Sequence, residues 1–545
     1  MDPASHRRKE AEGLLKKARI FYEKSEHEKA MDCCQKAAKL DPNNHEIPRL
    51  MAASLAGLGM HNEAAALISI ADGMEINDLY SRGKTDKALG ACDRIIQAGR
   101  GTYRILNMKA AALAHIDRHE DALVWFDRAL DLKPGDCALL SNKSASLESL
   151  DRHEESVSCC DVAIASNQSY PIAHQNKGVS LASMGRADEA IACFDEAIRL
   201  DPKYANALSS KGSMLLDMDM WEEAARCFKM ALDIDPTLYE TLVNMANAVG
   251  GMGMFEKALE YCGKALRIRE ERPVLHVAAF ALVHLGRHKE AITYYDRALK
   301  LKPNDYDAIL QKSSSLSQMG MADEAMKCCE AASKMRPGHY GIDLYQGQAL
   351  YSKGDYEGAL KRYEMAASKS TGDLEVLYNR AILFDEMGRH EDALRDYDEV
   401  SRLDPKHYLA RLNKGVVLQE IGRREEALTC YDEAIEICPH KYEAFHNKGL
   451  LLIRMERNGE ALEALNTALK LNPRDDAALF IAGMRLHSEA KYEKAIRRFD
   501  DVLDIDPNSG EAFFHKALSL ESMGKDKEAG VCRAEAKRVG FHMLK

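Results

Sequence analysis

Nine prolines recur along the chain with a fixed period, and this period restricts the fold more than any other feature of the sequence. They are Pro134, Pro202, Pro236, Pro303, Pro337, Pro405, Pro439, Pro473 and Pro507. Their separations are 34 residues or twice that length, with one of 67 residues. A period of this length is typical of a solenoid, in which small units pack only on their neighbours. The 545 residues have room for about sixteen such units from residue 9 onward.

Each unit has the sequence pattern of two helices joined by a turn. In residues 171–202, apolar and small residues recur every three or four positions on both sides of Gly185. Glycine adopts a left-handed conformation without steric cost, so Gly185 is expected to end the first helix. Pro202 ends the second helix, because proline disfavours helical geometry in the residue before it. The sequence therefore predicts an all-α fold of tandem helix-turn-helix units.

Two positions in the unit are occupied by small side chains. We call the position of the proline that ends a unit, such as Pro202, the closing position. Twelve residues before it, fifteen of sixteen units have alanine, and the exception is Ser156. Twenty-four residues before the closing position stands glycine, alanine or serine, as at Gly178 and Ser144. Small residues let two helix backbones approach closely, whereas a leucine would force them apart. We therefore expect the two helices of each unit to pack tightly against each other.

Together with an aromatic residue in the second helix, such as Phe194 or Tyr431, these features resemble the tetratricopeptide repeat family. The resemblance covers nearly the whole chain. It implies an α-solenoid of about sixteen tandem repeats that forms a right-handed superhelix. It also implies that the first helices line a concave groove, which is the usual ligand surface of the family. No particular partner or activity follows from it.

The spacing divides the chain into four regions. Residues 1–76 hold an N-terminal segment and two units, and residues 77–100 form a shortened unit at which we expect a kink. Residues 101–303 contain regular units, and residues 304–545 contain units with more apolar residues toward the expected groove. The last unit runs almost to Lys545 without the polar capping helix that a solenoid normally needs, so an open apolar end is expected there.

Charged residues recur in register between neighbouring units. Nine units have Lys or Arg just before the small residue of the first helix, and each has an acid sixteen residues earlier, in the preceding second helix. Both residues are missing at some junctions, for example at Asn466 and Ala482. We predict an ion pair at each of the nine junctions, worth at most about 1 kcal/mol if exposed. Duplication of one ancestral unit would also explain the pattern. The pairs are Asp93–Lys109, Asp127–Lys143, Asp161–Lys177, Asp195–Lys211, Asp296–Lys312, Glu364–Arg380, Asp398–Lys414, Asp432–Lys448 and Asp500–Lys516.

Asparagines on the first helices are the first candidates for partner binding. They recur just before the basic position, and in several relatives amides at this place hydrogen-bond the main chain of an extended peptide. An amide both donates and accepts, so it can bind a backbone of any sequence. The alternative is an asparagine that is solvated or supports its own helix. The residues are Asn142, Asn176, Asn244, Asn379, Asn413 and Asn447.

Apolar residues of the later first helices are the second candidates. One position before the asparagines, the later units have Leu310, Leu344, Tyr378, Leu412, Phe480 and Phe514, where earlier units have Asn107, Ser141, Gln175 and Ser209. Farther along come Ile382, Val416, Leu450, Met484 and Leu518. If these residues face the groove, its later half is an apolar trough for an amphipathic segment. Packing of helix on helix is the competing interpretation.

No catalytic or metal-binding motif is evident in the sequence. The fourteen cysteines form no C-x-x-C motif, and twelve lie at or beside the aromatic position, which predicts reduced thiols in the core. No signal-peptide pattern or long apolar run occurs, and the formal net charge is -11 with both signs interspersed. We expect a cytoplasmic protein without a cofactor that binds neither nucleic acid nor membrane.

The sequence favours a non-enzymatic scaffold or adaptor that binds peptide or helical segments of partner proteins in the groove. Two other functions stay open. One is a structural solenoid that self-assembles through its C-terminal repeat, and the more remote one is the non-catalytic arm of a transferase complex. The sequence leaves no residues outside the repeats for a catalytic domain.

Overall fold

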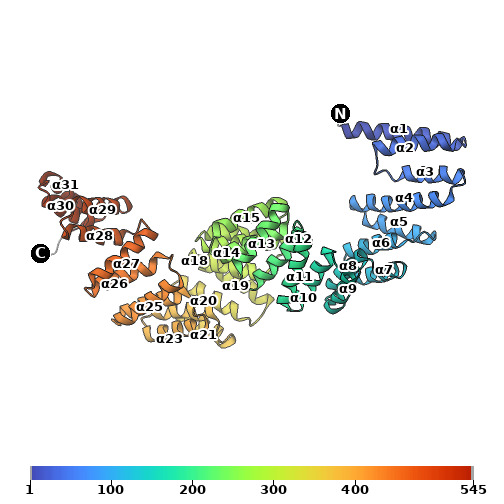
Figure 1. Ribbon diagram of the computed structural model, residues 1–545. Coiled ribbons are helices and arrows are strands. Elements are labelled where there is room, and N and C mark those ends of the chain that lie inside the picture. The colour runs from blue at the N-terminus through green and yellow to red at the C-terminus, as the bar shows by residue number, and fades with distance from the viewer. Residues whose placement is uncertain (1–2, 542–545) are drawn as a thin grey trace. The chain divides into compact units, whose positions relative to one another are not determined.

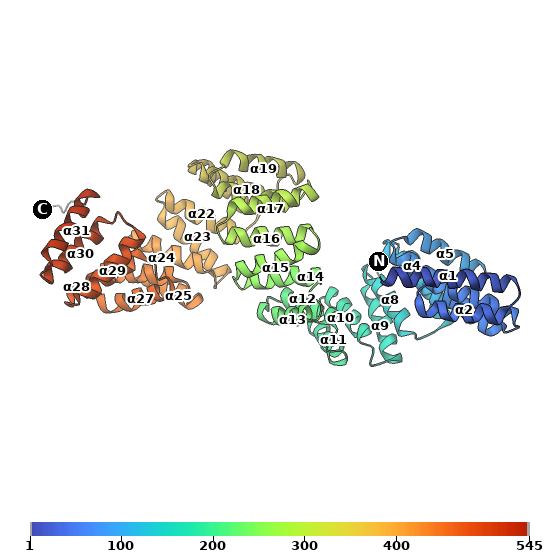
Figure 2. The same cartoon turned by 90° about the horizontal axis from the view of Figure 1, so that it is seen from above.

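The computed structural model describes the backbone of residues 3–541 and the side chains of residues 6–541. All regular structure in residues 3–541 is helical, with 31 α-helices and no strand (Figure 1). Within residues 1–285 and within residues 286–545, consecutive helices pack as antiparallel hairpins and each hairpin stacks on the next, as Figure 2 shows from a second direction. The predicted all-α solenoid of about sixteen units is confirmed. The chain divides into two compact parts, residues 1–285 and 286–545.

The first part contains sixteen helices. They are α1 (Pro3–Glu23), α2 (His27–Leu40), α3 (Glu46–Gly57), α4 (His61–Ser81), α5 (Thr85–Gln97), α6 (Tyr103–His115), α7 (His119–Leu132), α8 (Cys137–Glu148), α9 (His153–Ser166), α10 (Pro171–Ser183), α11 (Ala187–Leu200), α12 (Ala205–Asp217), α13 (Trp221–Ile234), α14 (Tyr239–Gly251), α15 (Phe255–Ile268) and α16 (Arg272–His284).

The second part contains fifteen helices. They are α17 (His288–Leu301), α18 (Tyr306–Gln318), α19 (Ala322–Met335), α20 (Tyr340–Ser352), α21 (Tyr356–Lys369), α22 (Leu374–Glu386), α23 (His390–Leu403), α24 (Tyr408–Glu420), α25 (Arg424–Ile437), α26 (Tyr442–Arg454), α27 (Asn458–Leu471), α28 (Asp476–Ser488), α29 (Tyr492–Ile505), α30 (Gly510–Ser522) and α31 (Asp526–Arg538).

Close contact between the two helices of a hairpin explains the small residues. A Cβ atom at Gly178 of α10 would lie 2.6 Å from the ring of Phe194 in α11, far inside the van der Waals distance. Gly415 meets Tyr431 in the same way, at 2.5 Å. The single serine among the alanines, Ser156, is buried, and its hydroxyl donates to the carbonyl of Ser144 at 3.0 Å. A buried polar group is therefore satisfied at the one exception.

The turn between the two helices keeps a left-handed residue even where glycine is absent. Gly185 has φ of 74°, as its sequence position predicts. Asp151 in the α8–α9 turn, Glu456 in the α26–α27 turn and Ala490 in the α28–α29 turn have φ between 56° and 60°. A side chain in this conformation costs about 1–2 kcal/mol, which tertiary packing must offset. The packing of the hairpin therefore imposes the left-handed turn even where the residue is not glycine.

Residues 77–100 begin inside a helix, which the sequence pattern did not indicate. The 21 residues of α4 run without a break from His61 to Ser81. This helix packs on α3 before it and on both α5 and α6 after it, so it serves as the second helix of one unit and the first helix of the next. Gly83 then provides the usual left-handed turn, with φ of 68°, before α5.

Two carboxylates on α4 connect the helices around it. Asp72 is 1% exposed and accepts from Arg100 at 2.5 Å and from Arg49 of α3 at 3.2 Å. Glu75, one turn later, pairs with the same Arg49 and with Arg94 of α5 at 3.1 Å. A buried carboxylate requires such cationic partners to offset its lost hydration. These four ion pairs fix α4 between α3 and α5.

The last described helix presents a mostly charged outer face. Exposed residues of α31 include Asp526, Lys527 and Arg538, and Val531, 64% exposed, is its one large apolar residue at the surface. The open apolar end expected from the sequence is therefore not found among the described residues. The reason is that α31 buries Ala529, Cys532 and Ala536 and leaves most of its charged residues to solvent.

Candidate functional site

Four first helices of the second part carry a pair of apolar residues four positions apart, and a fifth has a histidine and a leucine at the same spacing. Residues at this spacing lie on one side of a helix, one turn above the other. The pairs are Tyr378–Ile382, Leu412–Val416, His446–Leu450, Phe480–Met484 and Phe514–Leu518, from α22, α24, α26, α28 and α30. All of them except Leu412 are half-buried, so part of each side chain is accessible. We call these ten residues the apolar first-helix face.

The aromatic members of this face are held by other rings. The ring of Tyr378 lies 5.2 Å from that of His407 and 6.2 Å from that of Tyr397. Burial raises the pKa of the Tyr378 hydroxyl, and a hydrogen bond from the Asn413 amide, 3.0 Å long, partly opposes that rise. Ring contacts of this kind position an aromatic side chain without burying it fully.

Phe480 and Phe514 are also held by contacts with other rings. Leu412 differs from the aromatic residues in its burial. Phe480 lies 5.8 Å from Phe499 between ring centroids, and Phe514 lies 5.6 Å from Phe541. Leu412, in contrast, is 7% exposed and belongs to the core, so it offers almost no surface to a partner. Its expected place in the trough is thus corrected.

Five of the six asparagines already donate a hydrogen bond within the chain. Asn142 donates to Asn107 Oδ1 at 3.1 Å, Asn176 to Ser141 O at 3.0 Å, Asn244 to Ser213 Oγ at 3.0 Å, Asn379 to Glu375 O at 2.7 Å and Asn413 to Tyr378 Oη at 3.0 Å. Four of these acceptors lie on the preceding first helix, and that of Asn379 lies on its own helix. Asn447 is half-buried, and its side chain has no hydrogen bond to any residue that the structure describes. The amides thus connect neighbouring first helices.

Eight of the nine charged pairs lie within ion-pair distance across their junctions. Lys Nζ to Asp Oδ1 distances are 2.6 Å for Lys143–Asp127, Lys177–Asp161 and Lys312–Asp296, and 2.5 Å for Lys211–Asp195, Lys414–Asp398, Lys448–Asp432 and Lys516–Asp500; Lys109 pairs with Asp93. At a typical pair, the aspartate side chain is half exposed and the lysine side chain about one quarter exposed. Solvent screening therefore keeps each contribution small.

Arg380 differs from the other eight bases. Its guanidinium binds both oxygens of Asp396 in α23, at 2.7 and 2.8 Å, instead of forming the expected pair with Glu364. Asp396 occupies a position where seven other second helices have cysteine, and it is buried. A buried carboxylate needs a partner more than an exposed one, and the guanidinium fork matches it in a bidentate way. The pair therefore forms within one hairpin and not across a junction.

His446 belongs to the apolar first-helix face by position but makes a polar contact. Its Nδ1 lies 2.7 Å from Oδ2 of Asp475, the residue that caps α28 by accepting from the amide of Ala478. The hydrogen bond from His446 keeps the pKa of the Asp475 carboxyl below its usual value although burial opposes this, and the pKa of His446 is raised by the same bond. This contact connects α26 to the start of α28 and was not anticipated from the sequence.

Asp385, His390 and Glu420 form the single group of possible metal ligands among the described residues. The His390 Nδ1 atom lies 3.0 Å from Oδ1 of Asp385, which precedes it by five residues across the inter-helix turn. The same contact recurs at Glu148 and His153, at 3.1 Å. A recurring turn contact explains the arrangement, and we assign no metal to it.

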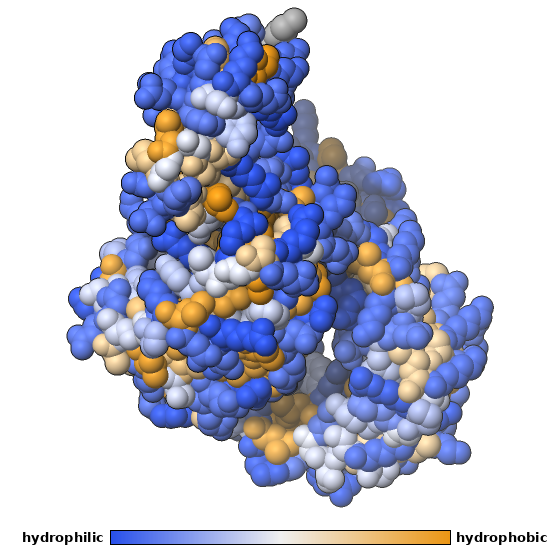
Figure 3. Space-filling view, turned by 90° about the vertical axis from the view of Figure 1, so that its right-hand side faces the viewer, coloured by the Kyte–Doolittle hydropathy of each residue, from blue (hydrophilic) through white to orange (hydrophobic). Residues whose placement is uncertain are grey.

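All fourteen cysteines are free thiols. Burial raises the pKa of Cys92, Cys160 and Cys262 to about 12, so these thiols stay protonated and unreactive. Within the described residues, no helix combines the length and apolar character needed to cross a bilayer. Figure 3 shows one face of the surface, where apolar residues form short bands among hydrophilic ones.

Comparisons with known proteins agree with this architecture. Models of the tetratricopeptide repeat match residues 11–44, 74–136, 171–204, 273–305, 310–373, 378–441 and 446–510. No curated protein matches the sequence.

Three solved structures resemble the chain at low sequence identity. A chain of the APC/C hetero-tetramer Cut9–Hcn1 is 14% identical with a TM-score of 0.44, covering 86% of this chain and 93% of its own. Yeast Tom70 is 15% identical with a TM-score of 0.36, covering 75% of this chain and 92% of its own. MamA is 23% identical with a TM-score of 0.28, covering 29% of this chain and 93% of its own. On the family models, this chain belongs to the tetratricopeptide repeat family.

Proposed function

We propose that the chain is a non-enzymatic scaffold that binds an amphipathic segment of a partner protein on the apolar first-helix face of α22–α30. The observation that carries this proposal is the set of eight half-buried apolar side chains that this face presents on five successive first helices. Partly exposed apolar side chains in a continuous row are typical of surfaces that bind other proteins. A helix that presents apolar residues every three or four positions matches such a row.

The asparagines favour this mode over the binding of an extended main chain. Five of the six use an amide hydrogen on a neighbouring group, as described above. We propose that they hold successive first helices in register, and that Asn447 is the amide most available to a partner. In this proposal the apolar side chains contribute most of the binding free energy, and the amides contribute alignment.

The two alternative functions have less support. Self-assembly through the C-terminal repeat requires an apolar end, and the outer face of α31 is mostly charged. A role as the arm of a transferase complex has no specific observation in its favour. The fourteen free cysteines favour a reducing compartment such as the cytoplasm.

Affinity capture from extracts of the source cell, followed by binding of synthetic segments of the captured proteins, tests the proposal. The double variant Leu450→Lys/Met484→Lys places two charges in the centre of the face. We expect it to weaken segment binding at least about tenfold, because buried lysines would lose their hydration. The matched control is Ala111→Lys/Ala145→Lys, at the same helical positions in the first part. Equal binding by both variants would refute the proposed face.

A further inference from the structure

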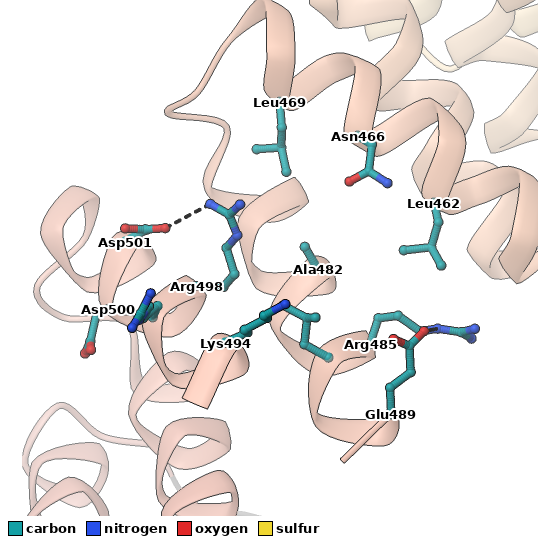
Figure 4. A pocket seen from close by; sticks show the side chains of 12 residues that line it. Leu462, Asn466, Leu469, Ala482, Arg485, Glu489, Lys494, Arg498, Asp500 and Asp501 are labelled. Carbon is teal, nitrogen blue, oxygen red and sulfur yellow. Dashed lines mark hydrogen bonds and ion pairs between the residues drawn. The ribbon is translucent and has the colours of Figure 1, made fainter. Parts of the chain in front are cut away.

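A pocket of 680 Å³ opens between α27, α28 and α29, and none of the ten residues of the apolar first-helix face lines it (Figure 4). Leu462, Asn466 and Leu469 of α27 face Ala482 of α28 and Lys494 of α29 across it. The volume lies within the range of about 300–1,000 Å³ that is usual for ligand sites. The three leucines that line it, Leu462, Leu469 and Leu486, are half-buried, so they provide an aliphatic floor.

The pocket lies at a junction that lacks the ion pair of the other units. Asn466 occupies the position of the acid and Ala482 that of the base. At the preceding junction, Lys448 and Asp432 hold the corresponding positions and form an ion pair at 2.5 Å. Since Ala482 lacks the long stem of a lysine and Asn466 lacks the charge to form an ion pair, the space between α27 and α29 stays open.

Arg485 also keeps this junction open. It occupies a position of the first helix that is buried in twelve other units. Those residues are Ser54, Ala112, Ser146, Ser180, Ala248, Ala281, Ser315, Ala349, Leu383, Val417, Leu451 and Ser519. Arg485 is exposed instead and pairs with Glu489 at 2.8 Å. A charged side chain cannot enter the core without a buried partner, so α28 cannot close against α27 as the other first helices do.

The cations of the lining exceed what its acids neutralise. Glu489 pairs with Arg485, Asp501 pairs with Arg498 at 3.1 Å, and Asp500 pairs with Lys516 at 2.5 Å. Lys494 and Arg497 are exposed and form no ion pair with any residue that the structure describes.

The charge of Lys494 is itself a departure from the repeat. The third position of the second helix is Asp or Glu in eleven of the other fifteen units. In several units that acid pairs with an arginine of the preceding turn, as Glu460 does with Arg457 at 2.7 Å. At Lys494 the sign is reversed, and the ammonium is left free above the aliphatic floor.

From this geometry we infer that the pocket is a second docking site, which binds an acidic segment of a partner protein through an aliphatic side chain. The aliphatic side chain enters between Leu462, Leu469 and Leu486. Flanking carboxylates pair with Lys494 and Arg497, whose charges no internal acid satisfies. Charge complementarity selects the acidic segment, because a basic segment would meet two uncompensated cations. The inference is independent of the apolar first-helix face.

Fluorescence polarisation with the full chain and labelled peptides tests this inference. The probe is a short peptide that alternates glutamate with leucine, and the comparison peptides have lysine in place of glutamate or alanine in place of leucine. We expect the glutamate–leucine peptide to bind most tightly, and its affinity to fall as salt rises, because screening weakens exposed charge pairs. Lys494→Glu/Arg497→Glu changes two exposed residues and should weaken its binding about tenfold or more.

A second variant closes the pocket without reversing any lining cation. Asn466→Asp/Ala482→Lys restores the pair found at eight other junctions, and the lysine stem then fills the pocket. We expect it to weaken binding of the glutamate–leucine peptide about tenfold or more. The matched control, Asp432→Asn/Lys448→Ala, changes the neighbouring junction in the opposite sense. There Glu460 and Glu463 stand in place of Lys494 and Arg497, so the control should keep affinity within about twofold.

Three results would overturn the inference. The first is equal affinity for the glutamate and lysine peptides. The second is unchanged affinity in Asn466→Asp/Ala482→Lys, with circular dichroism showing the native helix content. The third is a wild-type dimer in light scattering that becomes a monomer in that variant, which would mean that a second copy of the chain fills the pocket. Loss of binding in Leu450→Lys/Met484→Lys alone would concern the proposed function and not this site.

Discussion

The junction between α25 and α26 and the junction between α27 and α28 belong to successive repeats, yet they are built differently. At the first, Lys448 reaches Asp432 at 2.5 Å and forms an ion pair with it. At the second, Ala482 and Asn466 occupy the same positions, and a pocket remains. The hairpins on both sides keep the same helix lengths and left-handed turns. A repeat can therefore lose the ion pair to its neighbour without changing its own hairpin. The reason is that the side chains that join two repeats differ from those that pack the two helices of one hairpin.

The largest expected effect tests whether the two hairpins are really alike. Gly415→Ala in α24 and Gly483→Ala in α28 each place a Cβ atom against a buried ring, 2.5 Å from Tyr431 and 2.6 Å from Phe499. We expect each to lower the local free energy of unfolding by about 1–3 kcal/mol, because the clash exceeds the gain in helix propensity. Hydrogen exchange of the two hairpins measures both losses. A much smaller loss at Gly483 would show that the open junction has loosened its hairpin as well.

Substitutions in the inter-helix turns of the two regions are expected to have the next largest effect on the free energy of unfolding. Gly422, between α24 and α25, has φ of 82°, and Ala490, between α28 and α29, has φ of 57°. Gly422→Ala should lower the free energy of unfolding by about 1 kcal/mol, and Ala490→Gly should raise it by somewhat less, since glycine also gains entropy in the unfolded chain. Urea unfolding of the full chain compares the two. Stabilisation by both substitutions would contradict the assigned turn geometry.

The ion pair between Lys448 and Asp432 is expected to contribute less to the free energy of unfolding than the packing inside a hairpin. Lys448→Met keeps most of the stem and removes the charge, so it should lower the free energy of unfolding by about 0.5–1 kcal/mol in low salt and by less in high salt. Asp432→Gln is the reciprocal variant. The double variant Lys448→Met/Asp432→Gln should lower the free energy of unfolding by no more than either single substitution does. Additive losses would show that the two side chains do not act as a pair.

The repeat and the ion pairs between neighbouring repeats could be predicted because each depends on a residue at a fixed place in a rigid unit. Gly185 and Pro202 mark where helices end, and Gly178 marks where two backbones meet. Once those points are fixed, a base and an acid sixteen residues apart fall at the same junction in each unit. The predicted partners are therefore adjacent at eight junctions, including Lys143 with Asp127.

The remaining features depend on competition between side chains, which spacing does not reveal. Arg380 has an acid at the expected distance, but the more deeply buried Asp396 binds it instead. The fused helix α4 continues through Gly73, although glycine ends the first helix of many other units, and its carboxylates at Asp72 and Glu75 have partners far along the sequence. At the open junction, the sequence shows that Asn466 and Ala482 lack charge, but it does not show whether neighbouring side chains fill the space.

The smallest expected effect is a pH dependence confined to the open junction. His446 donates to Asp475 at the start of α28, while the matched positions one repeat earlier are Leu412 and Lys441, which form no such contact. The charged groups facing His446 are Asp475 and Asp476, with the ring of Tyr442 beside it.

The sign of this dependence follows from the two pKa shifts. The pKa of His446 is raised above its usual 6.5, so its contribution is complete below about pH 6.5 and is lost as the pH rises through the raised value. The pKa of Asp475 is lowered from 3.8, so its contribution is present above that pH and is lost only as the pH falls through the lowered value. The contact is therefore strongest between about pH 4 and 6.5, and it is worth at most about 1 kcal/mol because His446 is partly exposed. Hydrogen exchange at Ala478, corrected for the intrinsic rate, should be slower relative to Ala444 at pH 6 than at pH 8. His446→Gln should remove that difference, and its persistence in the variant would assign the pH dependence to another group.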